Sequence, residues 1–125
     1  MLKKTITYVD YNGVERTEDH YFNMTQTELK KLNIKTPGGY GAYIDKALKE
    51  QNGPAILDIF DTFILGAYGK KDADGIRFMK SKEISEAFSQ TEAYNVLFEE
   101  LSENPDKAVE FIKAILPEEY RKQLK

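Results

Sequence analysis

The stretch GPAILDIFDTFILGAYG, residues 53–69, is the part of the chain on which our interpretation of the fold depends. Pro54 suits the first turn of a helix, where a backbone N–H is not needed, and Gly69 is a natural helix end. The polar residues between them fall on one narrow strip at helical spacing, formed by Asp58, Asp61 and Thr62. A helix that is apolar on nearly all other sides must be wrapped by other elements, so the stretch predicts a core helix. It is shorter than the roughly 18 apolar residues of a membrane span, and its aspartates also argue against one.

The composition predicts a single ordered domain. The chain has 125 residues, 41% of them hydrophobic, with eight tyrosines and seven phenylalanines, which is enough to form a core of its own. It has no cysteine, so it has neither a disulfide nor a thiolate metal site, which suits a reducing cytoplasm. The N-terminal sequence MLKKTITYVD lacks the apolar run of a signal peptide. We therefore expect a soluble protein of the cytosol.

Charge is distributed unevenly along the chain. The net charge is -3, yet residues 81–103 carry six acidic residues against the single basic Lys82. No basic stripe is present that could neutralise phosphates, which argues against nucleic-acid binding. The acidic stretch is typical of a solvated helix face, and the alternative interpretation is an electrostatic docking face for a basic partner.

The N-terminal region is rich in Thr, Tyr, Val and Ile and predicts a β-hairpin with strands over residues 2–9 and 14–22. Its turn sequence, DYNG, admits two registers. A two-residue turn would scatter the apolar side chains over both faces, whereas a type I turn with Gly13 as a left-handed bulge residue pairs Asp10 with Val14. We expect the bulge turn, because it gathers on one face the side chains of Leu2, Ile6, Tyr8, Val14 and Phe22.

Helix start signals recur along the rest of the chain. Thr25 and Glu28 form a capping box that opens a short helix ending near Asn33, and a second helix is expected over residues 40–51. The polar segment 70–80 is expected to form a small hairpin or an ordered loop. The capping residues of three further helices are Ser81, Thr91 and Asn104.

These elements predict a mainly α fold with a small N-terminal β-hairpin, in the α+β class, with about five to six helices. We expect a single domain over residues 1–125, because no interdomain linker interrupts the sequence. Its parts are the hairpin (2–22), a helical core (25–116) and a charged C-terminal helix (117–125).

The sequence lacks the residue patterns of an active site. His20 is the single histidine and is expected to be a surface or half-buried strand residue. Asp72 and Asp74 resemble part of a calcium loop, but the other ligand positions of such a loop are not filled, so we expect a turn. The glycine cluster at residues 38–41 lacks the remainder of a nucleotide-binding motif and is expected to be a flexible break. We therefore predict no enzymatic activity, no cofactor and no metal site.

Four stretches of the chain are similar to one known family. They are TITYVDYNGVERTEDHYFNMTQTEL, TPGGY, GPAILDIFDTFILGAYG and DGIRFMKSKEISEAFSQTEAYNVLFEEL. On these stretches the chain resembles the tail assembly chaperones of long, non-contractile-tailed phages and prophages of Gram-positive bacteria. The likeness spans roughly residues 5–117, and its most diagnostic part is residues 67–94.

The resemblance implies a non-catalytic role. Such chaperones coat the long, helical, aggregation-prone tape-measure protein, keep it soluble, help to recruit tail tube subunits and leave before the virion matures. The family often occurs in two forms, the longer made by a ribosomal frameshift, and this chain resembles the short form; the tail tube protein would be bound through the long form. By the same resemblance we expect the protein in the cytoplasm of the bacterial host and not in the mature virion. Self-association is left open.

A helical client would place an apolar stripe in a groove between helices, with its basic residues against acidic side chains of the chaperone. Most aromatic residues are expected in the core, but one amphipathic helix face could stay open. The candidate partner-binding residues are Tyr94, Phe98, Glu92, Glu99 and Glu103. Two other functions stay open: a structural tail or connector protein retained in the virion, and a bacterial helical adaptor domain unrelated to phage.

Overall fold

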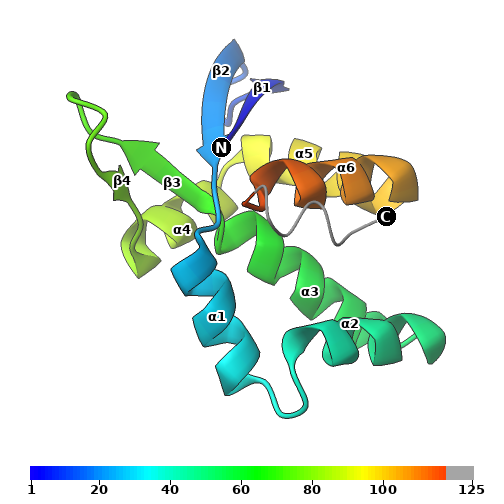
Figure 1. The fold of residues 1–125 in the computed structure, drawn as a ribbon. Coiled ribbons are helices and arrows are strands. Elements are labelled where there is room, and N and C mark those ends of the chain that lie inside the picture. Colours follow the sequence, from blue (N-terminus) through cyan, green and yellow to red (C-terminus); the bar gives the residue numbers. More distant parts are fainter. Residues whose placement is uncertain (118–125) are drawn as a thin grey trace.

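The structure of the chain is a computed structural model, and it describes residues 1–117 (Figure 1). Its elements, in chain order, are β1 (Leu2–Val9), β2 (Glu15–Phe22), α1 (Gln26–Lys35), α2 (Tyr40–Lys49), α3 (Gly53–Leu65), β3 (Tyr68–Lys71), β4 (Phe78–Met79), α4 (Lys82–Ser89), α5 (Glu92–Glu103) and α6 (Pro105–Ile115). The predicted α+β class is confirmed. The predicted C-terminal helix falls on residues outside the described part of the chain.

The predicted N-terminal hairpin and its bulge turn are confirmed. β1 and β2 pair antiparallel with Val9 opposite Glu15, as the bulge register requires. Gly13 has a φ of 81°, and the N–H of Asp10 donates to the carbonyl of Val14 at 2.9 Å. Val14 is nonetheless 52% exposed, although we expected it on the apolar side, because the turn end of the hairpin extends past the helices (Figure 1).

The helix predicted over residues 53–69 ends earlier than expected. α3 stops at Leu65, and Tyr68 and Gly69 begin β3, which pairs antiparallel with β2. β4 pairs with the other edge of β3, so the sheet has the strand order β1-β2-β3-β4. The prediction of an N-terminal hairpin alone was incomplete, because the free edge of β2 supplies backbone hydrogen bonds to the chain after α3 and so replaces the last turn of the helix.

The expectation that α3 is wrapped on nearly all sides is confirmed only for its second half. Ile59, Phe63 and Ile64 are buried, whereas Leu57 is 50% exposed and Phe60 is only partly buried. The first half of α3 lies beside α2 at the edge of the molecule, away from the sheet (Figure 1). The apolar surface of this helix therefore continues from the core to the molecular surface.

The centre of the core lies where β2 ends and the connector to α1 begins, at residues 22–24. The side chain of Phe22 is fully buried. Its ring meets three others edge-on at centroid distances of 5.5, 5.9 and 5.2 Å, those of Tyr68, Phe88 and Phe111. Edge-to-face pairs of this kind stabilise a core beyond the area that they bury.

The backbone of the connector is bonded to the ends of two helices. The N–H of Asn23 donates to the carbonyl of Ala67, just after α3, at 2.8 Å. The N–H of Met24 donates to the carbonyl of Ile115, the last residue of α6, at 3.0 Å. The connector thus joins the sheet to both helix ends.

Lys80 adds a third bond to the connector from the other edge of the sheet. Its Nζ donates to the carbonyl of Asn23 at 2.6 Å, to the carbonyl of Gly66 at 2.9 Å and to Oε2 of Glu28 at 2.6 Å. Burial of the Glu28 carboxylate acts to raise its pKa, but the hydrogen bonds from Lys80 and Thr25 outweigh burial, so the pKa lies below its ordinary value.

Replacing Lys80 by Met should lower the free energy of unfolding by about 2 kcal/mol at neutral pH, because two carbonyl oxygens and a carboxylate lose their donor. The stabilisation that comes from ionised Glu28 is fully present above the ordinary pKa of a glutamate. It disappears as the pH falls through the lowered pKa of Glu28 in the folded protein. The difference between wild type and variant should therefore shrink in acid, as measured by urea unfolding over a pH series.

Lys82→Met is the matched control, because the Lys82 side chain is 89% exposed and its one ion pair within residues 1–117 is with Glu86, at 3.8 Å. Its effect on the free energy of unfolding should stay below about 0.5 kcal/mol. Equal losses of stability in the two variants would mean that Lys80 does not hold the connector.

Gly69→Ala should also destabilise the fold, by about 1–3 kcal/mol, because β3 and β4 would have to separate. A Cβ at this position would lie 2.7 Å from the ring of Phe78 and 2.9 Å from the carbonyl oxygen of Met79. Gly41, in the first turn of α2, has nothing within 4 Å of such an atom, so Gly41→Ala should leave stability unchanged or raise it slightly. Thermal melts of both variants check this, and a larger loss for Gly41→Ala would contradict it.

Candidate functional site

The predicted aromatic pair on α5 packs against α3. Tyr94 and Phe98 are both half-buried. The hydroxyl of Tyr94 donates to Oδ1 of Asp61 at 2.6 Å, and the ring of Phe98 meets that of Phe60 edge-on at 6.0 Å. Burial and the hydrogen bond to Asp61 raise the pKa of the Tyr94 hydroxyl, so it stays protonated at neutral pH. These side chains join α5 to α3 and leave only their outer edges for a partner.

The three predicted acidic residues lie on another side of α5. Glu92, Glu99 and Glu103 are spaced by seven and four residues, which places them in one stripe at about 3.6 residues per turn, away from the two aromatic residues. Glu92 is half-buried and accepts a hydrogen bond from the amide of Asn95 at 3.0 Å, whereas the other two are exposed. The structure therefore separates the predicted partner-binding residues into an aromatic group and an acidic stripe, and their role in binding stays a prediction.

An apolar groove lies elsewhere, between α1, α2, α3 and α6. We name it the α1–α6 groove, and its volume is about 780 Å³. One side is lined by Leu29, Lys30, Leu32, Asn33 and Ile34 of α1 and by Tyr40, Gly41, Ile44 and Leu48 of α2. The rest is formed by Ile59 and Phe63 of α3, by Val109, Ile112 and Lys113 of α6, and by Leu116.

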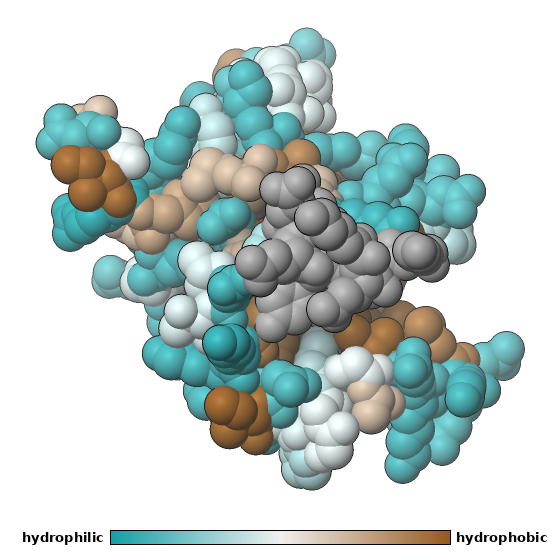
Figure 2. All heavy atoms as spheres, viewed as in Figure 1, coloured by the Kyte–Doolittle hydropathy of each residue, from teal (hydrophilic) through white to brown (hydrophobic). Residues whose placement is uncertain are grey.

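The groove has a buried floor and an exposed apolar rim. Ile59 and Phe63 form the buried floor. At the rim, Ile34 is 82% exposed, Leu48 59% and Val109 50%. Figure 2 shows apolar atoms gathered along the side of α2 that faces α6. Contiguous apolar surface of this kind, when it is open to solvent, marks a binding site for a partner.

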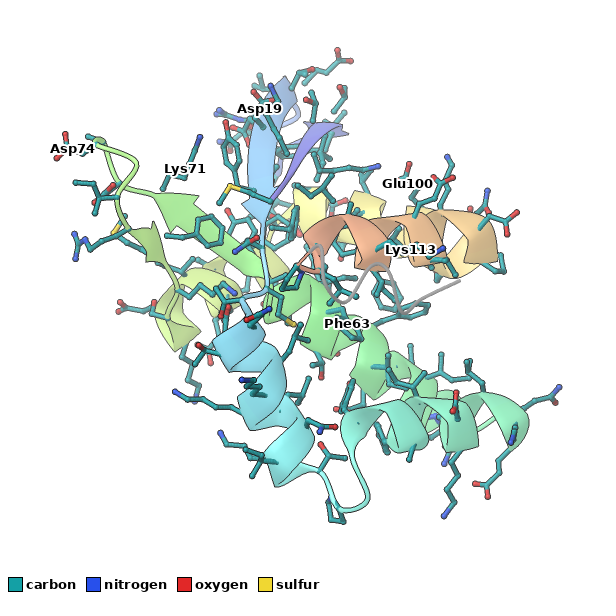
Figure 3. The ribbon with its side chains drawn as sticks, in the orientation of Figure 1. Asp19, Phe63, Lys71, Asp74, Glu100 and Lys113 are labelled. Carbon is teal, nitrogen blue, oxygen red and sulfur yellow. The ribbon has the colours of Figure 1, made fainter. Side chains whose placement is uncertain are left out.

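Lys30 and Lys113 are the charged residues among the described side chains that line the groove. Figure 3 shows Lys113 on α6 and Phe63 on α3, the two helices that border the groove on this side. Within residues 1–117 neither lysine forms an ion pair with a carboxylate. The described rim therefore carries two positive charges without a negative counterpart.

A second hollow, of about 720 Å³, lies at β2 and β3 and contains the single histidine. His20 is half-buried, as predicted, with its ring 5.1 Å from that of Phe88 and 5.9 Å from that of Tyr68. Burial lowers the pKa of His20, so the imidazole is neutral at neutral pH. Its Nε2 lies 3.7 Å from Oε1 of Glu18, beyond hydrogen-bond distance.

The segment that begins at Asp72 is a turn, as predicted. Oδ1 of Asp72 accepts hydrogen bonds from the N–H groups of Arg77 at 3.2 Å and Ile76 at 2.9 Å, and these bonds, that from Arg77 above all, hold the pKa of the carboxyl below its ordinary value. Asp10 closes the first hairpin in the same way, because its carboxylate accepts from two N–H groups of its own turn. Among residues 1–117, no group of three or more His, Cys, Asp or Glu side chains is placed to hold a metal ion.

Sequence reasoning missed most of the groove rim. Ile34 lies beyond the end near Asn33 that was predicted for its helix, and no motif in the sequence singles out Val109, Lys30 or Lys113. The signal that could have found Ile34 and Val109 is that each is an apolar residue placed in no predicted core face. Single surface hydrophobics are common, so this signal becomes informative only when the fold brings several of them together.

No helix in the described part of the chain is long and apolar enough to cross a membrane. Comparison with curated proteins and with solved structures finds no match. A family model described as "Phage tail assembly chaperone" matches residues 1–125, the whole of the sequence. This is the kind of family that the four sequence stretches resemble, and assembly chaperones have a non-catalytic role. The chain belongs to the phage tail assembly chaperone family.

Proposed function

We propose that this protein binds the tape-measure protein of its phage tail, keeps that protein soluble during assembly, and acts without catalysis. The α1–α6 groove is the observation that carries the proposal, because it is an open apolar surface on a member of an assembly chaperone family. A long helical client exposes apolar helix faces until the tail tube encloses it. Seating such a face in a groove between helices is a recurring mode of recognition.

The physical basis of this role is the burial of apolar surface. Moving an apolar helix face out of water lowers the free energy by about 25 cal/mol for each Å² of apolar area buried. The same fall in free energy drives client proteins to aggregate with one another when their apolar faces are uncovered. A chaperone that covers these faces reversibly prevents aggregation, and the growing tail tube can then replace it. No covalent step is needed.

Further parts of the role are proposed from the family resemblance. The protein helps to recruit tail tube subunits, through a longer form made by frameshifting, and this chain is the short form. It works in the cytoplasm of a Gram-positive host and leaves before the virion matures. Each of these statements extends the family assignment and is independent of which surface binds the client.

Co-expression with the tape-measure protein of the same phage or prophage tests the proposal. We expect the tape-measure protein to become soluble and to co-purify with this chain, because its apolar faces are covered. The control is expression of the tape-measure protein alone, which should leave it in the insoluble fraction. Centrifugation followed by affinity purification measures both outcomes.

A tape-measure protein that stays insoluble and unbound would contradict the proposal. Detection of this chain in purified virions, in amounts comparable to the tail proteins, would favour a structural tail or connector role instead. Mass spectrometry of purified particles distinguishes the two roles, since a chaperone that leaves before maturation is absent from them.

A further inference from the structure

We infer that the α1–α6 groove binds one amphipathic helix whose apolar face is flanked by acidic residues. The inference rests on the proposed function for the identity of the client, but the chemistry of the groove is argued from its own residues. Three features carry it: the helical walls, the length of the apolar floor and rim, and the two lysines.

The walls of the groove favour a helix over an extended peptide. Helices α1, α2, α3 and α6 form them, so the backbone N–H and C=O groups of the walls are largely used within those helices. An extended peptide seated there would bury backbone groups without partners, whereas a helix satisfies its own. The described strands do not line the groove, so strand addition at a sheet edge is not available.

The length of the groove matches about two turns of such a helix. Val109 and Leu116 mark the α6 side, and seven residues at about 1.5 Å each span roughly 10 Å. Ile44 and Leu48 on α2 are four residues apart and present one turn of apolar surface to the same space. An occupant with apolar residues at i, i+4 and i+7 therefore has a matching surface along its whole contact.

The charge of the groove selects acidic flanks. Lys30 and Lys113 line it from α1 and α6, and no carboxylate lines it in the described part of the chain. The four helices that form the walls carry seven lysines and six acidic residues in all, so the charge inside the groove comes from the two lysines that line it. A basic flank would be repelled here, whereas glutamates or aspartates would be attracted. This polarity is opposite to that of a client bound on the acidic stripe of α5, so the two sites can be distinguished.

A small-molecule ligand is less well matched to the groove than a helix. Such ligands are held by several convergent polar groups, but the polar side chains that line the groove are few. The amide oxygen of Asn33 already accepts the N–H of Tyr40 at 2.8 Å. An occupant that covers the exposed side chains of Ile34, Leu48 and Val109 along the rim must also extend over a long surface.

Two synthetic peptides of about 18 residues, long enough to form helix in part before binding, serve as probes. They share leucines at i, i+4 and i+7 spacing and differ only in their flanks, which are glutamates in one and lysines in the other. In fluorescence anisotropy titrations against the whole chain, the acidic peptide should bind about tenfold more tightly than the basic peptide. Equal affinities, or a preference for the basic peptide, would overturn the inference.

Substitutions at the rim locate the binding surface. Ile34→Asp and Val109→Asp should each weaken binding of the acidic peptide by about tenfold or more. Ile76→Asp is the matched control, because Ile76 is also 82% exposed. It lies between β3 and β4 and is not one of the residues that line the groove. Circular dichroism and thermal melts check that all variants are folded. Unchanged binding by the rim variants would exclude the groove.

The two lysines are tested by charge reversal. Lys30→Glu combined with Lys113→Glu should reverse the preference, so that the basic peptide binds more tightly than the acidic one. Lys3→Glu combined with Lys31→Glu changes the net charge equally at positions that do not line the groove, and it should preserve the preference. Identical behaviour of the two double variants would show that net charge, and not the groove, attracts the peptide.

Co-purification with the tape-measure protein separates failure of this inference from failure of the proposed function. Loss of the client in the Ile34→Asp variant but not in the Ile76→Asp variant supports both this inference and the proposed function. If the Ile34→Asp variant keeps the client and a double variant, Glu99→Lys with Glu103→Lys, loses it, the client binds on α5. That result would overturn this inference and leave the proposed function standing. Binding of the acidic peptide in the groove by a chain that never binds the client would overturn only the proposed function.

A second copy of the chain is the remaining competitor for the groove. Light scattering of the wild type and of Ile34→Asp at equal concentrations measures this directly. A dimer that becomes monomeric on substitution, together with no binding of either peptide, would make the groove a contact between copies and overturn the inference.

Discussion

The bonds to the connector between β2 and α1 determine where the walls of the groove lie. Phe22 is the centre of the core, and the backbone of the next two residues is bonded by the chain after α3, by the end of α6 and by Lys80. The hydrogen bond from Met24 to Ile115 brings the end of α6 beside the start of α1. Both helices line the groove, so a contact in the core sets the spacing of a surface site.

The second constraint is the apolar surface of α3, because the neighbouring elements cover only part of it. α4 and α5 contact its second half, while α2 is the described helix that lies beside its first half (Figure 1). Ile59 and Phe63 consequently serve two purposes, since they belong to the core and also form the floor of the groove. Apolar surface left open in this way costs solubility unless a partner covers it, which is consistent with an assembly role.

Local signals made much of the fold predictable from the sequence. Thr25 and Glu28 form the capping box, and Ser81, Thr91 and Asn104 cap their helices, because each cap depends on a few neighbouring residues. β3 was not predictable in the same way, since its pairing requires the edge of β2, more than forty residues earlier in the chain. The groove has the same difficulty, because four helices contribute to it and no single helix shows it.

Charge illustrates why a site is harder to predict than a fold. A net charge of -3 and the glutamates of α5 suggest a basic partner when the sequence is considered as a whole. In the structure, Glu100 is paired with Lys4 at 2.9 Å and Lys107 at 3.4 Å, so part of that charge is already neutralised. Exposed charges are screened over about 8 Å at physiological salt, so the lysines at the groove act on a ligand there more than the distant glutamates do. The sign of the charge beside the apolar surface, and not the sign of the whole chain, therefore determines which helix the groove accepts.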